Sequence, residues 1–577
     1  MFVKSTLVVF ATLATILSPV NALWPEPRSV STGSTALRLS DGFTITSSVP
    51  NTPGDLTAAI KDAKSFLQND KLGRLVVDRG ASDSALVKKA KTISKLTLSL
   101  NKGAVVKSIT AEAQKAPDAR DEKYTLTVPG DGSAASITAS STLGLYRGLT
   151  TFAQLFYYTD GNTYLLNAPI KIEDSPAYPW RGLMLDTARN YFPVADIKRQ
   201  LLAMSYNKMN QFHWHIVDSQ SFPLQIKGYE DLAAHAAYDA KSVYSPSDVA
   251  DIVSFAGAHG IDVMVEIDTP GHTAAIANSH PEYIACAGAA PWATYANEPP
   301  AGQLRLASSD VVKYTSGLLA AAAKMFPSTL FSTGGDEINS VCYQNDTETQ
   351  KSLNATGKTF EQALDTFTQE THKAIIAEGK TPVVWEEMVL VHNVTLAKDT
   401  NVLVWISSDD VQAVAEAGYK IVHAASDYFY LVCLLFFMTG RSDAHFRTQD
   451  CGGGGWVGNF PTGNSWCDPF KTWQHAYSFD PVANLTAAQA KLIQGGQHLL
   501  WTEQSGPQNV DPVTWPRASS SAELWWTGPP TNLSATLDAA LPRLHEQSYR
   551  MRQRGINTIS LQPEYCALRP GKCDLTA

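Results

Sequence analysis

The sequence predicts a closed barrel of eight parallel strands, the (β/α)8 or TIM-barrel fold, preceded by a small α+β domain. From Trp180 onward, short apolar runs alternate with longer helical patterns, which indicates parallel strands joined by helices. Eight such runs carry polar or aromatic residues at or near their ends, as expected where a barrel gathers its active site at the carboxyl ends of its strands. An open doubly wound sheet is the alternative, but no Gly-rich phosphate-binding turn follows a first strand.

The first 22 residues have the pattern of a secretory signal peptide. Lys4 precedes an apolar run, Leu7–Leu17, and the small residue Ala22 stands at the expected cut. The run is too short to span a membrane, and no later stretch reaches ~18 uninterrupted apolar residues. We therefore expect a secreted, extracellular protein without a membrane anchor. Five Asn-x-Ser/Thr sites agree with that route, at Asn345, Asn354, Asn393, Asn484 and Asn532.

The N-terminal α+β domain is predicted over residues 23–175. It mixes strand-like runs, Leu75–Val77 and Tyr124–Val128, with helical patterns at Asp55–Leu67 and Leu143–Tyr158. The net charge of −9 is spread along the 577 residues and no long Lys/Arg run occurs, so nucleic acid is an unlikely partner.

The catalytic barrel is predicted over residues 176–577. Each of its expected strands is a short apolar run with polar or aromatic residues at or near its end. In chain order they are Arg181–Asp186, Gln211–Asp218, Asp262–Asp268, Leu330–Glu337, Pro382–Glu387, Asn401–Ile406, Lys420–Ala425 and His498–Glu503.

Seven cysteines leave one unpaired in an oxidising compartment. Pairing of neighbours along the chain gives Cys451 with Cys467 and Cys566 with Cys573, and leaves Cys286 with Cys342. Cys433 is then the odd residue.

Two adjacent carboxylates, Asp336 and Glu337, follow Gly334-Gly335 at the end of the fourth run. Neighbours in sequence cannot readily stand on opposite faces of one sugar ring, as an acid and a nucleophile would. A substrate with a 2-acetamido group supplies its own nucleophile, and then needs one acid/base and one carboxylate for the acetamido nitrogen. Trp385, Trp405 and Trp501 near other strand ends could form an apolar wall for a sugar. Arg189 and Glu503 add ionic hydrogen-bond partners for hydroxyls.

Together these motifs closely resemble family 20 β-N-acetylhexosaminidases, particularly those secreted by filamentous fungi. The resemblance extends from Leu23–Pro27 to the last cysteine pair. The motifs that carry it are Arg181–Asn190, Phe212–Pro223, Glu266–His272, Gly334–Glu337 and Leu500–Glu503.

The resemblance implies an exo-acting enzyme that removes terminal N-acetylglucosamine or N-acetylgalactosamine by substrate-assisted retaining hydrolysis, without cofactor or metal. Glu337 would be the general acid/base, and Asp336 would orient the acetamido group. The other implied roles are sugar hydroxyl binding by Arg189, Glu503 and Asp450, ring contacts by Trp385, Trp405 and Trp501, acetamido binding by Tyr430, and support of Glu337 by Asp218 and His272.

The family resemblance also implies a homodimer and a removable propeptide from Leu23 to about Lys91. It favours chitobiose as substrate over other N-acetylhexosamine-terminated glycans. Release of a disaccharide instead of one sugar stays open within the same family.

Two alternative functions remain, a metal-dependent hydrolase and a sugar-binding protein without activity. His213-Trp-His215 could begin the metal site of an amidohydrolase-type barrel, but no clear set of further His ligands follows, which favours a hydrogen-bonded pocket wall instead. A barrel that keeps its tryptophans and Arg189 could also bind a glycan without cleaving it.

One segment departs from the family pattern. Tyr430-Leu431 should run directly into Asp450, yet Val432–Gln449 separates them. The segment contains Cys433, the cysteine left without a partner, and an apolar run, Leu434–Met438, that would be exposed. The codons for its first two residues and its last residue can carry the terminal nucleotides of an intron, which indicates a retained intron. We expect the spliced form, without this segment, to be the active one, and the chain as written to be weakly active or inactive; a genuine loop is the alternative.

Overall fold

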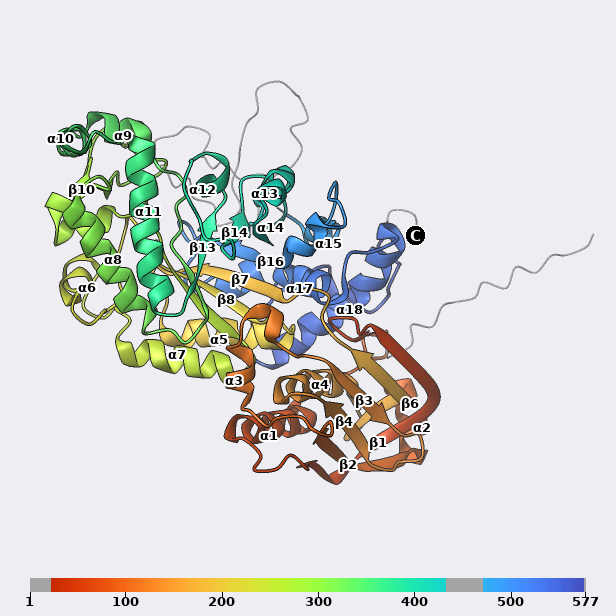
Figure 1. Ribbon diagram of the computed structural model, residues 1–577. Helices are drawn as coiled ribbons and strands as arrows, with labels where there is room; N and C mark the ends of the chain where they lie inside the picture. The colour runs from red at the N-terminus through yellow and green to blue at the C-terminus, as the bar shows by residue number, and fades with distance from the viewer. Residues whose placement is uncertain (1–21, 432–470, 575–577) are drawn as a thin grey trace, which may run out of the picture.

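The computed structural model describes residues 22–431 and 471–574, and within them the predicted barrel is confirmed. Eight parallel strands close in the order β12-β13-β14-β15-β16-β7-β8-β9, with helices around them (Figure 1). The strands are β7 (Trp180–Asp186), β8 (Gln211–Val217), β9 (Asp262–Ile267), β12 (Leu330–Ser332), β13 (Thr381–Trp385), β14 (Asn401–Val404), β15 (Lys420–His423) and β16 (Ile493–Leu500).

Some predictions fall outside the described residues. They are most of the signal peptide, the Val432–Gln449 segment, Asp450, Cys433 and the Cys451–Cys467 pair.

Two of the barrel strands, β12 and β16, differ from the predicted runs by five residues at one end. β12 ends at Ser332 and not at Glu337, because Gly334, Gly335 and Glu337 take φ values of 67°, 97° and 54°, which no extended strand holds. β16 begins at Ile493, five residues before the predicted start. Its Gly495 was unexpected in a strand, but a Cβ there would lie 2.0 Å from the carbonyl oxygen of Trp180 on β7.

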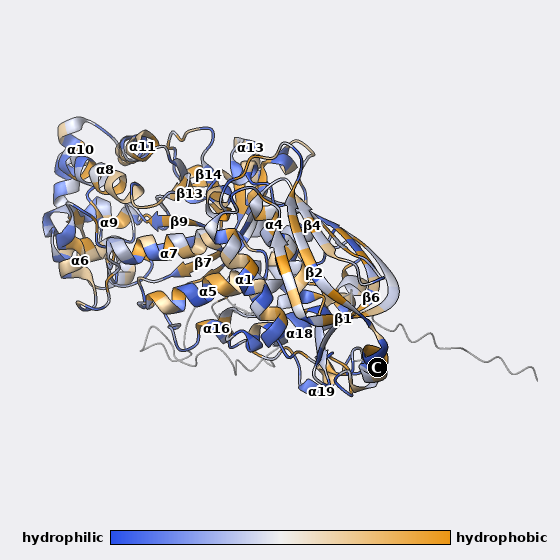
Figure 2. Cartoon of the chain, turned by 90° about the horizontal axis from the view of Figure 1, so that it is seen from below, coloured by the Kyte–Doolittle hydropathy of each residue, from blue (hydrophilic) through white to orange (hydrophobic). Residues whose placement is uncertain are grey.

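The barrel helices cover the outside of the strands. In α5 and α7 apolar and polar residues alternate, as Figure 2 shows, because one face of each helix packs on the barrel. The barrel helices are α5 (Val194–Tyr206), α6 (Glu230–Ala236), α7 (Pro246–Ala258), α8 (Ser309–Ala323), α9 (Ser340–Asn345), α10 (Thr347–Thr356), α11 (Phe360–Ala377), α12 (Glu387–Leu390), α13 (Val411–Ala417), α14 (Ser426–Phe429), α15 (Trp473–Tyr477), α16 (Val510–Thr514), α17 (Arg517–Thr527), α18 (Leu533–Gln553) and α19 (Glu564–Ala567). Two short strands, β10 (Ile284–Ala285) and β11 (Gln303–Leu304), pair in the loop after β9.

The N-terminal domain is a six-stranded mixed sheet with helices, which confirms the predicted α+β class. The strand order is β1-β2-β4-β3-β6-β5, and β1 also pairs with β6. Leu75–Val77, predicted as a strand, instead lies in a turn. The elements are β1 (Ser29–Ser47), α1 (Gly54–Asn69), α2 (Ser84–Lys89), β2 (Lys91–Leu100), α3 (Ile109–Ala113), β3 (Tyr124–Val128), β4 (Ala135–Ala139), α4 (Thr142–Gln154), β5 (Tyr157–Thr159) and β6 (Asn162–Asp174).

The segment predicted as a removable propeptide is built into this sheet. β1 pairs in parallel with β2 and antiparallel with β6. Before it, Trp24 is fully buried, and its indole Nε1 donates to the carbonyl oxygen of Ser519 at 3.0 Å. Residues 23–91 therefore contribute to the packing of both domains, whether or not the chain is later cut. No helix among the described residues has the length and apolar character needed to cross a membrane.

Candidate active site

The predicted site residues, apart from Asp450, lie at the carboxyl ends of the barrel strands. Each follows or ends a strand: Arg189 after β7, Asp218 after β8, His272 after β9, Asp336 and Glu337 after β12, Trp385 at the end of β13, Trp405 after β14, Tyr430 after α14, and Trp501 and Glu503 after β16.

The two adjacent carboxylates share one neighbour, His272. Its Nε2 lies 3.4 Å from Glu337 Oε2 and 3.7 Å from Asp336 Oδ2. Burial opposes the charge on this ring, but Asp218 and Asp336 outweigh that effect and hold the pKa of His272 well above its usual range. Asp336 is buried, whereas the Glu337 side chain is 19% exposed and can meet a ligand.

Asp336 is paired with a second buried carboxyl, Asp268. Asp268 Oδ1 accepts a hydrogen bond from the Gly335 amide at 2.8 Å. Burial raises the pKa of Asp268 to about 7. Burial and the neighbouring Asp268 also raise the pKa of Asp336 well above its usual range. Two carboxyls this close share one proton near neutral pH, and Asp336 Oδ1 has no hydrogen-bond partner within the described part of the chain.

Arg189 lies among carboxylates from three segments. Its Nη2 is 2.9 Å from Asp218 Oδ2, its Nη1 donates to Asp186 Oδ2 at 3.3 Å, and its Nε donates to Glu298 Oε1 at 3.0 Å. Its guanidinium carbon is 4.9 Å from the ring centroid of Trp501. Burial opposes its charge, but the carboxylates keep the pKa of Arg189 well above its usual value, so this cation is permanent.

Four aromatic rings form one continuous group beside the carboxylates. The centroid of Trp385 lies 6.5 Å from Trp405 and 6.1 Å from Trp501. Tyr430 stacks on Trp405 at 6.3 Å and 14°, and lies 6.4 Å from Trp501. Such a wall suits the C–H face of a sugar and a small acyl methyl group.

Glu387 links this wall to the acid. It accepts a hydrogen bond from Trp405 Nε1 at 2.8 Å and a longer one from the Glu337 amide at 3.4 Å. Burial raises its pKa to about 8. Burial also raises the pKa of Glu503 to about 8. Its Oε2 has no hydrogen-bond partner among the described residues.

Sequence reasoning missed Glu298, which contacts Arg189 and lies 3.7 Å from His272 Nδ1. No periodic pattern marks it, because it stands in the irregular loop between β10 and β11. Asp268 could have been found, since it ends the third predicted strand within the Glu266–His272 motif.

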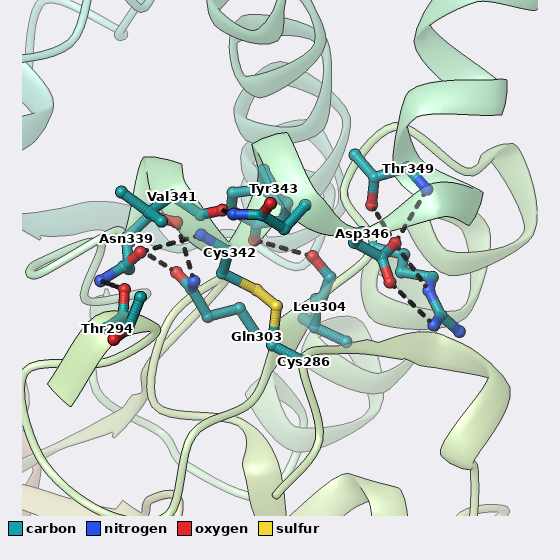
Figure 3. The surroundings of a disulfide bond; sticks show 12 residues. Cys286, Thr294, Gln303, Leu304, Asn339, Val341, Cys342, Tyr343, Asp346 and Thr349 are labelled. Atoms are coloured by element: carbon teal, nitrogen blue, oxygen red, sulfur yellow. Dashed lines mark hydrogen bonds and ion pairs between the residues drawn. A yellow bond between two sulfur atoms is a disulfide. The ribbon is translucent and has the colours of Figure 1, made fainter. Parts of the chain in front are cut away.

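The loop that carries Glu298 is held at both ends. The Cys286–Cys342 disulfide, predicted from the sequence, ties it to α9, the helix that follows Glu337. Figure 3 shows this bond with Gln303 beside it, whose Nε2 donates to the Asn339 carbonyl at 3.1 Å. The predicted Cys566–Cys573 bond is also formed.

His213 and His215 do not form the predicted alternative of a metal-binding pair. Both point into the barrel from β8, but their nitrogens face protein groups. His215 lies between Glu266 at 2.6 Å and Asp218 at 2.7 Å, and His213 Nδ1 is 2.9 Å from Gln497 Nε2. Among the described residues, two groups of side chains lie close enough together to hold a cation, and both contain His272. One group adds Asp218 and Glu298, and the other adds Asp268 and Asp336.

Comparison with protein families gives two matches. The catalytic domain of glycosyl hydrolase family 20 matches residues 178–529, and a domain described as beta-acetyl hexosaminidase like matches residues 23–155.

Several characterised proteins are similar over most of the chain. A beta-hexosaminidase of Arthroderma benhamiae is 34% identical over 475 residues, which cover 79% of this chain and 74% of that protein. A chitooligosaccharidolytic beta-N-acetylglucosaminidase of Ostrinia furnacalis is 33% identical over 472 residues, 78% of this chain and 75% of that one. Among solved structures, the GH20 beta-N-acetylhexosaminidase of Streptomyces coelicolor superimposes with a TM-score of 0.67 at 22% identity, covering 95% of this chain and 98% of that chain, which supports the fold.

Proposed function

The chain belongs to glycosyl hydrolase family 20, and from this membership and the site geometry we propose that it is an exo-acting β-N-acetylhexosaminidase. Its substrates are chitooligosaccharides and other glycans that end in N-acetylglucosamine or N-acetylgalactosamine. The observation that carries the proposal is the pair of adjacent carboxylates, one buried and one partly exposed, beside a four-ring aromatic wall. The names of the relatives at 31–34% identity agree with it.

In the first step the carbonyl oxygen of the 2-acetamido group attacks the anomeric carbon. The C1–O bond to the leaving group breaks, and Glu337 gives its proton to the departing oxygen. A bond between C1 and the acetamido oxygen forms, and the sugar becomes a cyclic oxazolinium ion. This route needs no protein nucleophile, which fits a site where the two carboxylates are neighbours in sequence.

Asp336 stabilises the positive charge of this intermediate. Its Oδ1, which has no hydrogen-bond partner among residues 22–431 and 471–574, accepts the acetamido N–H, a charge-assisted hydrogen bond in a buried setting. Because Asp336 shares a proton with Asp268, charge developing on the ligand draws the negative charge onto Asp336 and leaves the proton on Asp268.

In the second step Glu337 acts as base. It takes a proton from a water molecule whose oxygen attacks C1 from the side the leaving group vacated, and the bond from C1 to the acetamido oxygen breaks. Two inversions give net retention. Arg189 and Glu503 bind the ring hydroxyls, and the aromatic group encloses the sugar and the acetamido methyl.

We also propose that the protein is secreted and forms a homodimer. The signal-like pattern of residues 1–22 and the exposed asparagines of all five Asn-x-Ser/Thr sites support secretion. The homodimer rests on the family resemblance alone. Light scattering of the purified protein and amino-terminal sequencing of protein from culture medium test the two proposals.

The function is tested by comparing aryl β-glycosides of N-acetylglucosamine, N-acetylgalactosamine and glucose. We expect hydrolysis of the first two with retention at C1, inhibition by a thiazoline analogue of the intermediate, and no loss after exhaustive chelation. A glucoside cleaved as fast as the N-acetylglucosaminide would refute the mechanism, because glucose carries no internal nucleophile.

A further inference from the structure

His215 occupies a fully buried position between two carboxylates. Its Nδ1 lies 2.6 Å from Glu266 Oε1 on β9, and its Nε2 lies 2.7 Å from Asp218 Oδ2 beyond β8. A ring with a carboxylate at each nitrogen carries a proton on both. Burial opposes the charged ring, but the two carboxylates outweigh it and raise the pKa of His215 to about 10. At neutral pH this residue is therefore an imidazolium.

The contact continues from His215 to the acid. Asp218 uses Oδ2 for His215 and Oδ1 for His272 Nδ1, at 3.1 Å. The opposite nitrogen of His272, Nε2, lies 3.4 Å from Glu337 Oε2. His272 has a φ of 55°, a backbone conformation that non-glycine residues rarely adopt, so the direction of its ring depends on the contacts that hold it.

We propose that His215 is a positioning residue that fixes the acid Glu337 through Asp218. The imidazolium, together with Arg189 Nη2, holds Oδ2 of Asp218, so that the other oxygen of this carboxylate stays directed at His272. The ring of His272 is then oriented with Nε2 towards Glu337. This inference rests on the proposed hydrolase function and gives the His-x-His motif of β8 a role that requires no metal.

His215 also contributes a positive charge to the site. The charged groups that face it are Glu266, Asp218 and Arg189, whose Nη1 lies 3.5 Å from His215 Nε2. Loss of the imidazolium leaves less positive charge to compensate the two carboxylates. The groups that face Glu337 are His272, Asp336 and Glu387. Loss of a proton from a more negative site is less favourable, so the alkaline limb of the pH profile moves to higher pH.

Two amide variants separate the contacts. The amide nitrogen of glutamine reaches about the position of Nε2, so His215→Gln keeps a donor for Asp218 but loses the contact with Glu266. The amide nitrogen of asparagine reaches about the position of Nδ1, so His215→Asn does the reverse. We expect kcat on chitobiose to fall at least about tenfold in His215→Asn and clearly less in His215→Gln, with KM within about twofold of wild type.

Both His215 variants should shift the alkaline limb of the kcat/KM profile to higher pH. His423→Gln is the matched control, since His423 is a similarly buried barrel histidine whose Nε2 lies 3.0 Å from the Pro481 carbonyl oxygen. It should lower the thermal unfolding temperature and leave the limb in place. Equal kcat losses in the two His215 variants, or limbs that match the control, would overturn the inference.

Glu266→Gln provides a second measurement if the His215 variants do not fold, because it is nearly isosteric. It removes a negative charge, so the alkaline limb should move downwards, opposite to the His215 variants. An unchanged limb with full kcat would overturn the positioning role. If wild type cleaves the N-acetylglucosaminide while the variants fail these expectations, only this inference is wrong; an inactive wild type contradicts the proposed function instead.

Discussion

Gly334→Ala is a direct test of how the backbone places the catalytic carboxylates. Gly334 has a φ of 67°, and a Cβ added there would lie 1.9 Å from Asp268 Oδ1 and 2.9 Å from Asp268 Cα. Rotation of the Asp268 side chain removes the first overlap but not the second, because Cα belongs to the backbone. The substitution therefore displaces Asp268 from Asp336.

The magnitude follows from two terms. An alanine in the left-handed region costs about 1–2 kcal/mol. Displacement of Asp268 also breaks its 2.8 Å hydrogen bond with the Gly335 amide, and a buried group left unsatisfied costs about 1–3 kcal/mol. We expect a loss of about 2–5 kcal/mol in the free energy of unfolding. A shift of about 1 Å in Asp336 would lower kcat about 100-fold.

Gly357→Ala is the matched control. Gly357 ends α10 with a φ of 66°, and no atom lies within 4 Å of an added Cβ, so the variant has the same backbone strain without the overlap. Urea unfolding and kcat on chitobiose are measured for both. The reasoning is refuted if Gly334→Ala loses no more stability than Gly357→Ala, or keeps the wild-type kcat.

Glu337→Gln should lower turnover of chitobiose about 10²–10⁴-fold and that of an activated aryl glycoside far less, whereas Asp336→Asn should slow both; near-normal rates in either variant would contradict the assignment. Replacing both Cys286 and Cys342 with serine removes a cross-link between residues 56 positions apart, and the chain-entropy model gives a loss of about 4 kcal/mol in stability. The urea midpoint should therefore fall, and KM should rise because the loop is less firmly held. An unchanged midpoint would count against this prediction. The pKa of Asp268 is raised from 3.8 to about 7, so the folded state keeps a proton that the unfolded state has released, and stability is lost as pH rises from about 4 through 7. Asp268→Asn lacks this loss, and its free energy of unfolding relative to wild type should rise between pH 5 and pH 8; a constant difference would show that Asp268 does not titrate as described.

The barrel and most of the site could be predicted from sequence because strand ends carry local signals. Trp385 ends a short apolar run, and a parallel barrel brings such ends together without further information. The end of β12 could not be predicted, because Glu337 continues an apparent strand in sequence and only its positive φ shows the turn. The start of β16 was missed because Gly495 is atypical of strands, and close approach to Trp180 explains it only in three dimensions.

Side chains that act through distant partners were the hardest to predict. Glu298 has no pattern around it, since its place depends on a disulfide and on Arg189, far away in the chain. For His213 and His215 the sequence favours a hydrogen-bonded pocket wall and leaves a metal site as the alternative. An His-x-His pair on a strand fits metal ligands and buried hydrogen-bonded rings equally well, and only the positions of Glu266 and Asp218 decide between them.

Two barrel strands, β7 and β9, have ion pairs at their amino-terminal ends and candidate site residues beyond their carboxyl ends. At the amino-terminal ends of β7 and β9, Arg181 and Asp262 pair with Glu122 and Arg120 of the N-terminal domain, at 2.6 Å and 3.0 Å. Glu122 also accepts from Arg147 at 2.7 Å, so one buried carboxylate contacts two buried cations. Removing one partner of such a group leaves an uncompensated charge and costs about 3–5 kcal/mol. The N-terminal domain therefore supplies the ionic partners of Arg181 and Asp262 at the amino-terminal end of the barrel, whereas the strained backbone and the proton-sharing carboxyls on which the proposed reaction depends lie at the carboxyl end.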